Sequence, residues 1–136
     1  MKRNLFLWGL VLLAGVLALS AATERDKRSR TPAIREFMRQ KLVHSQAVLE
    51  GLAVEDYDQI LTNAKKMIAM SQEGTWNVLG GSEYAEHSLN FRRNAEALVK
   101  AANLANLDSA TLAYVRVTMS CVECHKYVRT RKTAGL

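Results

Sequence analysis

The chain has little of what builds turns, strands or disulfide frameworks. Its 136 residues include one proline, seven glycines and two cysteines, and β-branched residues are few. Folds rich in strands and tight turns depend on these residue types, so we expect an all-α protein. A disulfide between cysteines three positions apart would close a loop too small to constrain the unfolded chain much. A disulfide-stapled scaffold is therefore a poor explanation of the pair.

The N-terminal 22 residues are typical of a secretory signal peptide. A basic start precedes an apolar run from Leu5 to Leu19, and small residues follow. The run is short for a membrane span of about 20 residues, so an uncleaved anchor is the alternative. We expect an exported, periplasmic protein, with a membrane association only if this segment is retained. A charged tether over residues 23–31, a folded domain over 32–131 and a tail over 132–136 complete the expected organisation.

Four segments carry apolar residues at helical spacing, and none shows a sustained period of two. The first helix is expected to begin at Thr31-Pro32, with Thr31 as cap, and to end near Gly51. The second opens in the acidic stretch 54–58, and a loop over 73–82 separates it from the third. Ser82 and Asp108 are the expected caps of the third and fourth helices. Four amphipathic helices with short connections predict an antiparallel four-helix bundle.

The inner face of each helix follows from its apolar period. In the first and last helices the expected stripes are Ile34, Met38, Leu42, Ser45, Leu49 and Leu52, and Leu112, Val115, Thr118 or Met119, Val122 and His125. The third helix offers Tyr84, Ser88, Phe91, Ala95, Leu98, Ala102 and Ala105, and the second a stripe from Tyr57 through Ala64 to Ser71. Small residues on inner stripes leave room in the core for something else to fill.

Both cysteines lie in the run Cys121-Val122-Glu123-Cys124-His125. A dithiol redox pair normally follows a strand in a βαβ unit, and no strand is predicted here. A zinc site needs further ligands, and only His44 and His87 remain. A c-type haem site uses both thiols as thioethers and the adjacent histidine as iron ligand. Positions 121, 124 and 125 share one face of a helix, which favours the haem interpretation.

The chain resembles class II c-type cytochromes, which comprise the cytochrome c′ group and its low-spin, methionine-ligated relatives. The shared residues are the Cys-x-x-Cys-His run, Arg129 four places after the histidine, and Phe91 with the alanines that follow it in the preceding helix. The likeness covers about residues 32–131. It implies a four-helix bundle with one covalent haem c near the C-terminus, held by Cys121 and Cys124. It further implies His125 as the proximal iron ligand and Arg129 beside the haem.

The opposite face of the iron decides between electron transfer and gas binding. The resemblance places the distal residue on the first helix, where Met38 stands on the expected inner stripe. Ordinary core filling is the alternative role for Met38. His44 is a chemical rival, but its position turns it about 120° away from that stripe. His87 is interpreted as a half-exposed polar residue.

We therefore expect a carrier of single electrons, not an enzyme, that serves redox partner proteins. The alternative is a five-coordinate, cytochrome c′-like protein that binds nitric oxide or carbon monoxide. Basic residues after the haem motif suit an acidic partner, or else a helix C-terminus. The net charge of +6 is modest and no basic groove with interleaved aromatics is visible, so no nucleic acid partner is expected. A homodimer is a further possibility that the sequence leaves open.

Overall fold

A computed structural model describes residues 32–133, and the chain divides into two compact units, residues 1–36 and 37–136. The expected signal peptide, the tether and the Thr31 cap lie outside the described residues. The second unit holds the bundle and the cysteine motif. Among the described residues, no helix is long and apolar enough to cross a membrane.

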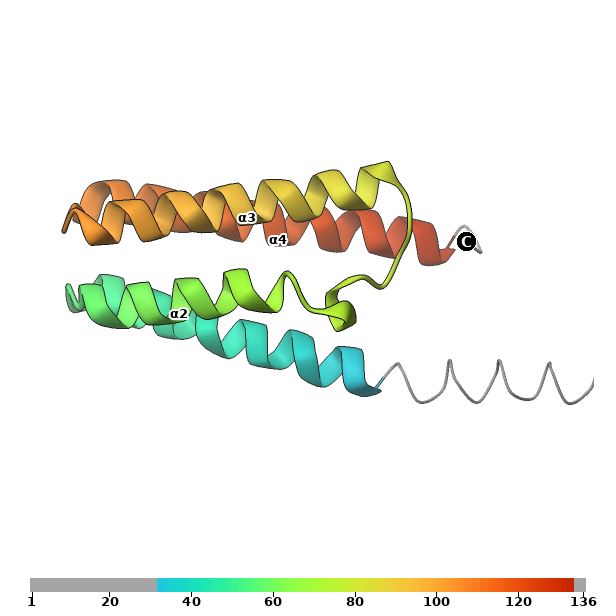
Figure 1. Cartoon of the computed structure of the whole chain (residues 1–136), viewed down its shortest axis with the longest axis horizontal. Coiled ribbons are helices and arrows are strands. Elements are labelled where there is room, and N and C mark those ends of the chain that lie inside the picture. The colour runs from blue at the N-terminus through green and yellow to red at the C-terminus, as the bar shows by residue number, and fades with distance from the viewer. Residues whose placement is uncertain (1–31, 134–136) are drawn as a thin grey trace, which may run out of the picture. The chain divides into compact units, whose positions relative to one another are not determined.

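The second unit is an antiparallel four-helix bundle (Figure 1). A first helix occupies residues 32–53, followed by α2 (Tyr57–Met70), the short 3-10 helix η1 (Gly74–Trp76), α3 (Ser82–Asn103) and α4 (Leu107–Thr133). Successive helices run in opposite directions, and α3 and α4 form one layer over the first helix and α2 (Figure 1). Residues 32–133 contain no strand. The predicted fold class is confirmed.

Hydrogen bonds between side chains link the first helix to α4 and to α2. Ser45 on the first helix and Tyr114 on α4 pair through their hydroxyls at 3.2 Å, and the Tyr114 hydroxyl donates to the Ser45 carbonyl at 3.0 Å. His44 Nδ1 lies 2.9 Å from Asn63 Oδ1 on α2. The first helix is therefore flanked by α2 on one side and by α4 on the other.

The helix starts differ in part from those expected. Asp56 caps α2, since its carboxylate accepts a hydrogen bond from the Gln59 N–H at 2.9 Å, as its acidic segment suggested. Ser82 is the first residue of α3 and Gly81 holds the cap position, with a φ of 108°. The expected Ser82 cap is thus displaced by one residue, because the positive φ of that turn suits glycine.

The fourth helix also begins earlier than expected. The Asn106 side chain accepts a hydrogen bond from the Ser109 N–H at 2.9 Å, which is the capping contact predicted for Asp108. Asp108 instead lies in the first turn, where its charge suits the positive end of the helix. The expected fourth cap was therefore two residues late.

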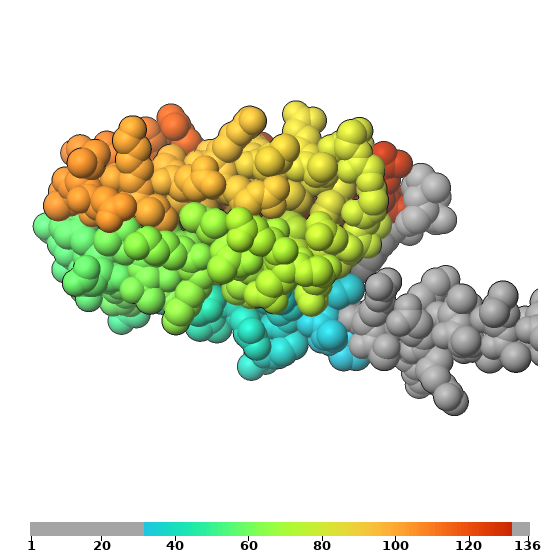
Figure 2. Space-filling model, in the orientation of Figure 1, coloured from blue at the N-terminus to red at the C-terminus, as the bar shows by residue number. Residues whose placement is uncertain are grey.

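The core along α2 and α3 matches the predicted stripes. Its buried members are Ile60, Ala64, Met67 and Met70 on α2, and Tyr84, Ser88, Phe91, Ala95, Leu98, Ala101 and Ala102 on α3. Ala105 lies beyond the end of α3 and is exposed. Figure 2 shows the atoms of α2 and α3 meeting along this face of the bundle.

The predicted stripe of the first helix is right at Leu52, which is 7% exposed, but is otherwise displaced by about one position. Leu42 and Leu49 are 56% and 54% exposed, whereas Phe37, Lys41 and Val48 are 8%, 7% and 0% exposed. The buried stripe contains Lys41, and a count of apolar residues passes over a lysine, so the period of the buried residues is not detected in the sequence. Met38 consequently lies at the edge of the buried stripe and is half-buried.

The predicted stripe of α4 is also wrong. Its large apolar residues Leu112, Val115, Met119 and Val122 are exposed. The inner face instead carries small residues and the motif cysteines: Ala110, Ala113, Val117, Ser120, Cys121 and Cys124. Both helices that flank the candidate site thus also carry large aliphatic side chains on their outer faces.

Candidate functional site

The two cysteines lie on the inner side of α4. Cys121 and Cys124 are free thiols, half-buried, and packed against the core. Val122 and Glu123 between them are exposed, as a spacing of three along a helix requires. His125 follows on the exposed flank of the same helix. The structure thus brings the three predicted motif residues together on neighbouring positions of one helix.

Lys41 is the site residue that the sequence prediction missed. Its Nζ lies 4.1 Å from the ring centroid of Trp76 and 4.0 Å from that of Phe91. The thiols of Cys121 and Cys124 lie near enough to act on the pKa of this amine. No carboxylate within residues 32–133 forms an ion pair with it. Its position in the sequence could have indicated that it is buried, because Lys41 lies one turn after Phe37 and seven residues before Val48 on an otherwise apolar face.

Three aromatic rings pack together, and the Lys41 amine lies over two of them, Trp76 and Phe91. Trp76 lies 5.1 Å from Phe91 and 6.5 Å from Phe37, between ring centroids. Aromatic faces attract cations, which accounts for the position of the lysine. Lys41 and the three rings, near the first motif cysteine, are called the compartment below.

Hydrogen bonds fix Trp76 and the loop that carries it. Trp76 Nε1 donates to Ser88 Oγ at 2.9 Å, and Ser88 Oγ donates to the Tyr84 carbonyl at 3.0 Å. The Tyr84 hydroxyl donates to the Trp76 carbonyl. Both Trp76 and Ser88 are buried. The loop between α2 and α3 is therefore anchored to α3 through its indole.

Burial disfavours the charged forms of the Lys41, Cys124 and His125 side chains. Burial lowers the pKa of Lys41, an effect that the nearby thiols of Cys121 and Cys124 oppose. Burial likewise raises the pKa of the Cys124 thiol. Loss of hydration lowers the pKa of His125, and the positive charges of Lys41 and Arg129 add to this. An imidazole biased toward its neutral form is the form that ligates a metal.

These properties weigh against the two rival interpretations of the motif. A redox-active thiol needs a lowered pKa and an accessible position, whereas burial raises that of Cys124. A zinc site needs clustered ligands, and the described residues contain no group of three or more His, Cys, Asp or Glu that could hold a metal. His44 is bound to Asn63, and the His87 ring packs on Tyr127 at 5.0 Å.

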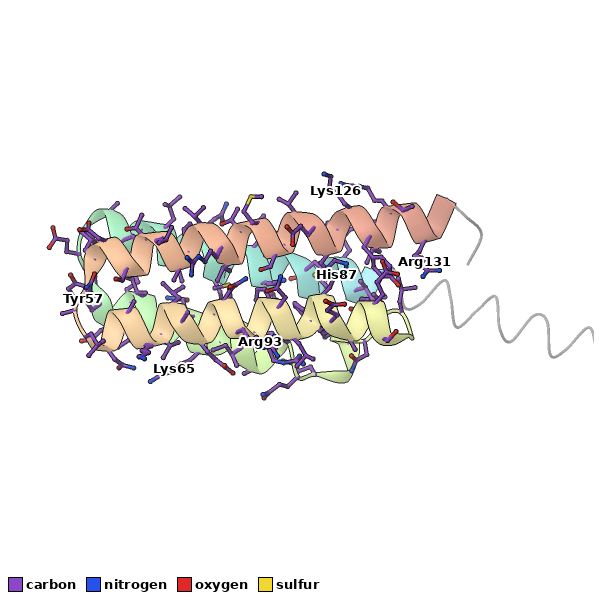
Figure 3. The ribbon with its side chains drawn as sticks, turned by 90° about the horizontal axis from the view of Figure 1, so that it is seen from above. Tyr57, Lys65, His87, Arg93, Lys126 and Arg131 are labelled. Carbon is purple, nitrogen blue, oxygen red and sulfur yellow. The ribbon has the colours of Figure 1, made fainter. Side chains whose placement is uncertain are left out.

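An open hollow of about 440 Å³ lies beside the motif, between the loop before α3 and the last turns of α4. Its lining includes Glu83, Tyr127 and Arg131. Arg131 donates to the Glu83 carboxylate at 3.1 Å and lies 5.3 Å from the Tyr127 ring centroid. Figure 3 shows His87 and Arg131 on the side of α4 that faces α3, with Lys126 on its other side.

The remaining predicted site residues occupy less decisive positions. Arg129 is exposed, and its positive charge acts on His125. Arg131, which the sequence did not single out, makes the contact with the loop. Met38 packs against the core from the edge of the buried stripe. Roles for Arg129 and Met38 remain predictions.

The bundle has the fold of cytochrome c′. One cytochrome c′ structure matches with a TM-score of 0.62 and 18% sequence identity, over 74% of this chain and 94% of that chain. A nitric oxide complex of a mutant cytochrome c prime from Alcaligenes xylosoxidans matches with a TM-score of 0.60 and 19% identity, over 73% of this chain and 91% of that chain. A ferrous variant of cytochrome c prime from that organism matches with a TM-score of 0.60 and 19% identity, over 73% of this chain and 93% of that chain. No family model matches the chain, and no curated protein does.

Proposed function

We propose that the chain is an exported c-type cytochrome that transfers single electrons through one covalently attached haem. The observation that carries this proposal is the pair of free, half-buried thiols, Cys121 and Cys124, on the inner side of the last helix of a cytochrome c′-type bundle. His125 follows them directly and supplies the nitrogen ligand that the motif requires.

The residues present fit a haem. Cys121 and Cys124 would hold the haem through two thioether bonds, each made by addition of the thiol S–H across a vinyl group, so attachment would need no oxidant. His125 would supply a ring nitrogen as iron ligand. Rings of Phe37, Trp76 and Phe91 supply apolar contact and exclude water. When bound, the haem iron supplies the one-electron change between its ferric and ferrous states.

Electron transfer is favoured over gas binding because the first helix offers donor side chains at the core. A filled sixth position keeps diatomic ligands off the iron and suits one-electron exchange. The resemblance points to Met38 for that position, and Met38 does pack against the core. Exposed Lys126 and Arg129 lie beside the motif, where a basic rim suits an acidic redox partner.

Haem staining of the protein after denaturing electrophoresis tests the proposal. The protein must be produced with a haem-attachment system, and a stained band at its mass is expected. A Cys121→Ser, Cys124→Ser double variant is the matched control and should lose the stain. A colourless wild-type band refutes the proposal, because the thiols would then serve another purpose.

Binding of nitric oxide or carbon monoxide to five-coordinate haem is the second candidate. Several of the similar structures are nitric oxide complexes, and the buried Phe37 offers no donor atom. This candidate predicts a high-spin spectrum and rapid carbon monoxide binding by the reduced protein. Electron transfer predicts a low-spin spectrum that carbon monoxide changes slowly or not at all.

A further inference from the structure

The Lys41 amine is the buried group that neither the bundle nor the haem motif explains. Lys41 is 7% exposed, and its amine lies over the rings of Trp76 and Phe91 and near Cys121. A buried ammonium without a carboxylate is costly, because the rings return only part of its lost hydration. A helix surface position was available one residue away, at the exposed Leu42.

Attachment of haem would remove the partners that the amine now has. The thiols of Cys121 and Cys124 are the groups that oppose the lowering of the Lys41 pKa. Once both sulfurs are thioethers they can neither ionise nor donate a hydrogen bond. The ammonium would then have no partner among the two sulfurs, whereas a neutral amine could donate its lone pair to a haem iron, which is a Lewis acid that binds nitrogen donors.

We propose that Lys41 Nζ is the distal ligand of the haem iron, with His125 as the proximal one. This inference rests on the proposed haem attachment and goes beyond it, since it assigns a ligand that the sequence resemblance does not. The neutral amine donates its lone pair, so the ammonium releases one proton to solvent on binding. No electron is exchanged in this step.

Position favours Lys41 over the other side chains of the first helix. Phe37 points a ring with no donor into the same compartment. Met38 lies on the flank of the buried stripe, while Lys41 lies on its centre between Phe37 and Val48. The Lys41 chain is also long enough to carry its amine to Cys121 Sγ, which is the attachment point of the haem.

Optical and electron paramagnetic resonance spectra of the purified, haem-loaded ferric protein test the proposal. The wild type should be low-spin and should lack the red absorption band of a methionine sulfur bound to ferric iron. Lys41→Ala should become high-spin. Lys41→Arg should also become high-spin, because a guanidinium keeps its charge and offers no lone pair. Met38→Leu tests the rival ligand that the resemblance implies, and it should stay low-spin.

Chemical rescue separates loss of a ligand from loss of structure. A small primary amine such as ethylamine should return the Lys41→Ala protein to the low-spin form at concentrations that leave Lys41→Leu high-spin, because leucine fills the cavity. Far-ultraviolet circular dichroism should be the same for all variants. A variant that loses its helical signal is replaced by the volume-matched Lys41→Leu for the spin-state comparison.

The outcomes distinguish failure of this inference from failure of haem attachment. A protein without haem stain refutes the proposed function. If the wild-type protein carries haem but is high-spin, the Lys41 ligand alone is refuted. The same holds if the Lys41→Ala protein carries haem and is low-spin. A stained protein that turns high-spin only in Met38→Leu assigns the distal position to the methionine and equally overturns the inference.

Discussion

Replacement of Ser88 by alanine should lower the free energy of unfolding, because it removes the hydrogen-bond acceptor of the Trp76 indole. Trp76 and Ser88 are 2% and 4% exposed, so water cannot replace the lost acceptor of the indole N–H. A buried donor left unsatisfied costs about 1–3 kcal/mol. For a unit of about 100 residues, each kcal/mol lowers the melting temperature by about 4–8 °C. We therefore expect Ser88→Ala to melt several degrees or more below the wild type.

The assay is thermal unfolding of the haem-loaded protein, followed by circular dichroism. Thr118→Ala is the matched control, because Thr118 Oγ1 makes the same back-bond to a helix carbonyl, at 3.1 Å, but on an exposed face. That variant should stay within about 0.5 kcal/mol of the wild type. An indole-specific effect should further appear as coupling: Ser88→Ala should cost about 1 kcal/mol less when Trp76 is already phenylalanine.

Equal melting temperatures for the Ser88→Ala and Thr118→Ala proteins would refute this reasoning. The loop between α2 and α3 would then be held by ring packing alone, through Phe37 and Phe91. A Ser88→Ala protein that melts lower but shows no coupling with Trp76→Phe would place the loss at the helix back-bond to Tyr84. The hydrogen bond between Trp76 and Ser88 is supported only if Ser88→Ala loses stability and this loss is smaller in the Trp76→Phe background.

Two further predictions concern the first helix. Gly51→Ala should lower the free energy of unfolding by about 1–3 kcal/mol, because a β-carbon there would lie 3.0 Å from the Asp56 carbonyl oxygen, just before α2. Gly80→Ala is the control: a β-carbon there would have nothing within 4 Å, so it should have little effect in the same denaturant titration. In a Cys121→Ser, Cys124→Ser chain, the unfolding free energy should rise with pH from the lowered pKa of Lys41 up to 10.5, because the unfolded lysine binds more protons over that window. Lys41→Leu should remove that slope, and a slope that persists in the Lys41→Leu chain would assign it to another group.

The fold and the motif could be predicted from the sequence because both depend on local patterns. The period of α2 and α3 is carried by residues that are apolar and buried, so the apolar count finds the right face. The spacing of Cys121, Cys124 and His125 is itself helical and needs no tertiary information. Asp56 follows the ordinary rule for acidic caps. In each of these cases the local preference and the tertiary structure agree.

The inner faces of the first helix and α4 could not be found in this way. Both helices carry large apolar residues on an outer stripe as well as on the inner one, as Leu42 and Val115 show. Helical periodicity reports that a stripe exists and does not say which stripe meets the core. Lys41 was excluded from any inner stripe by its charge, although burial of a lysine needs only a suitable environment. Long-range contacts with Trp76 and Phe91 supply that environment, and no local pattern encodes them.

The mismatch between local preference and burial is itself informative about function. Along α2 and α3, hydrophobic burial accounts for the inner residues apart from Ser88, which accepts the hydrogen bond of the Trp76 indole. The first helix and α4 instead turn a lysine, a serine and two thiols inward, at Lys41, Ser120, Cys121 and Cys124. Apolar residues at these positions would pack at lower cost. Proteins keep such costly choices at functional sites, so the two helices that depart from the simple pattern are the two expected to hold the cofactor between them.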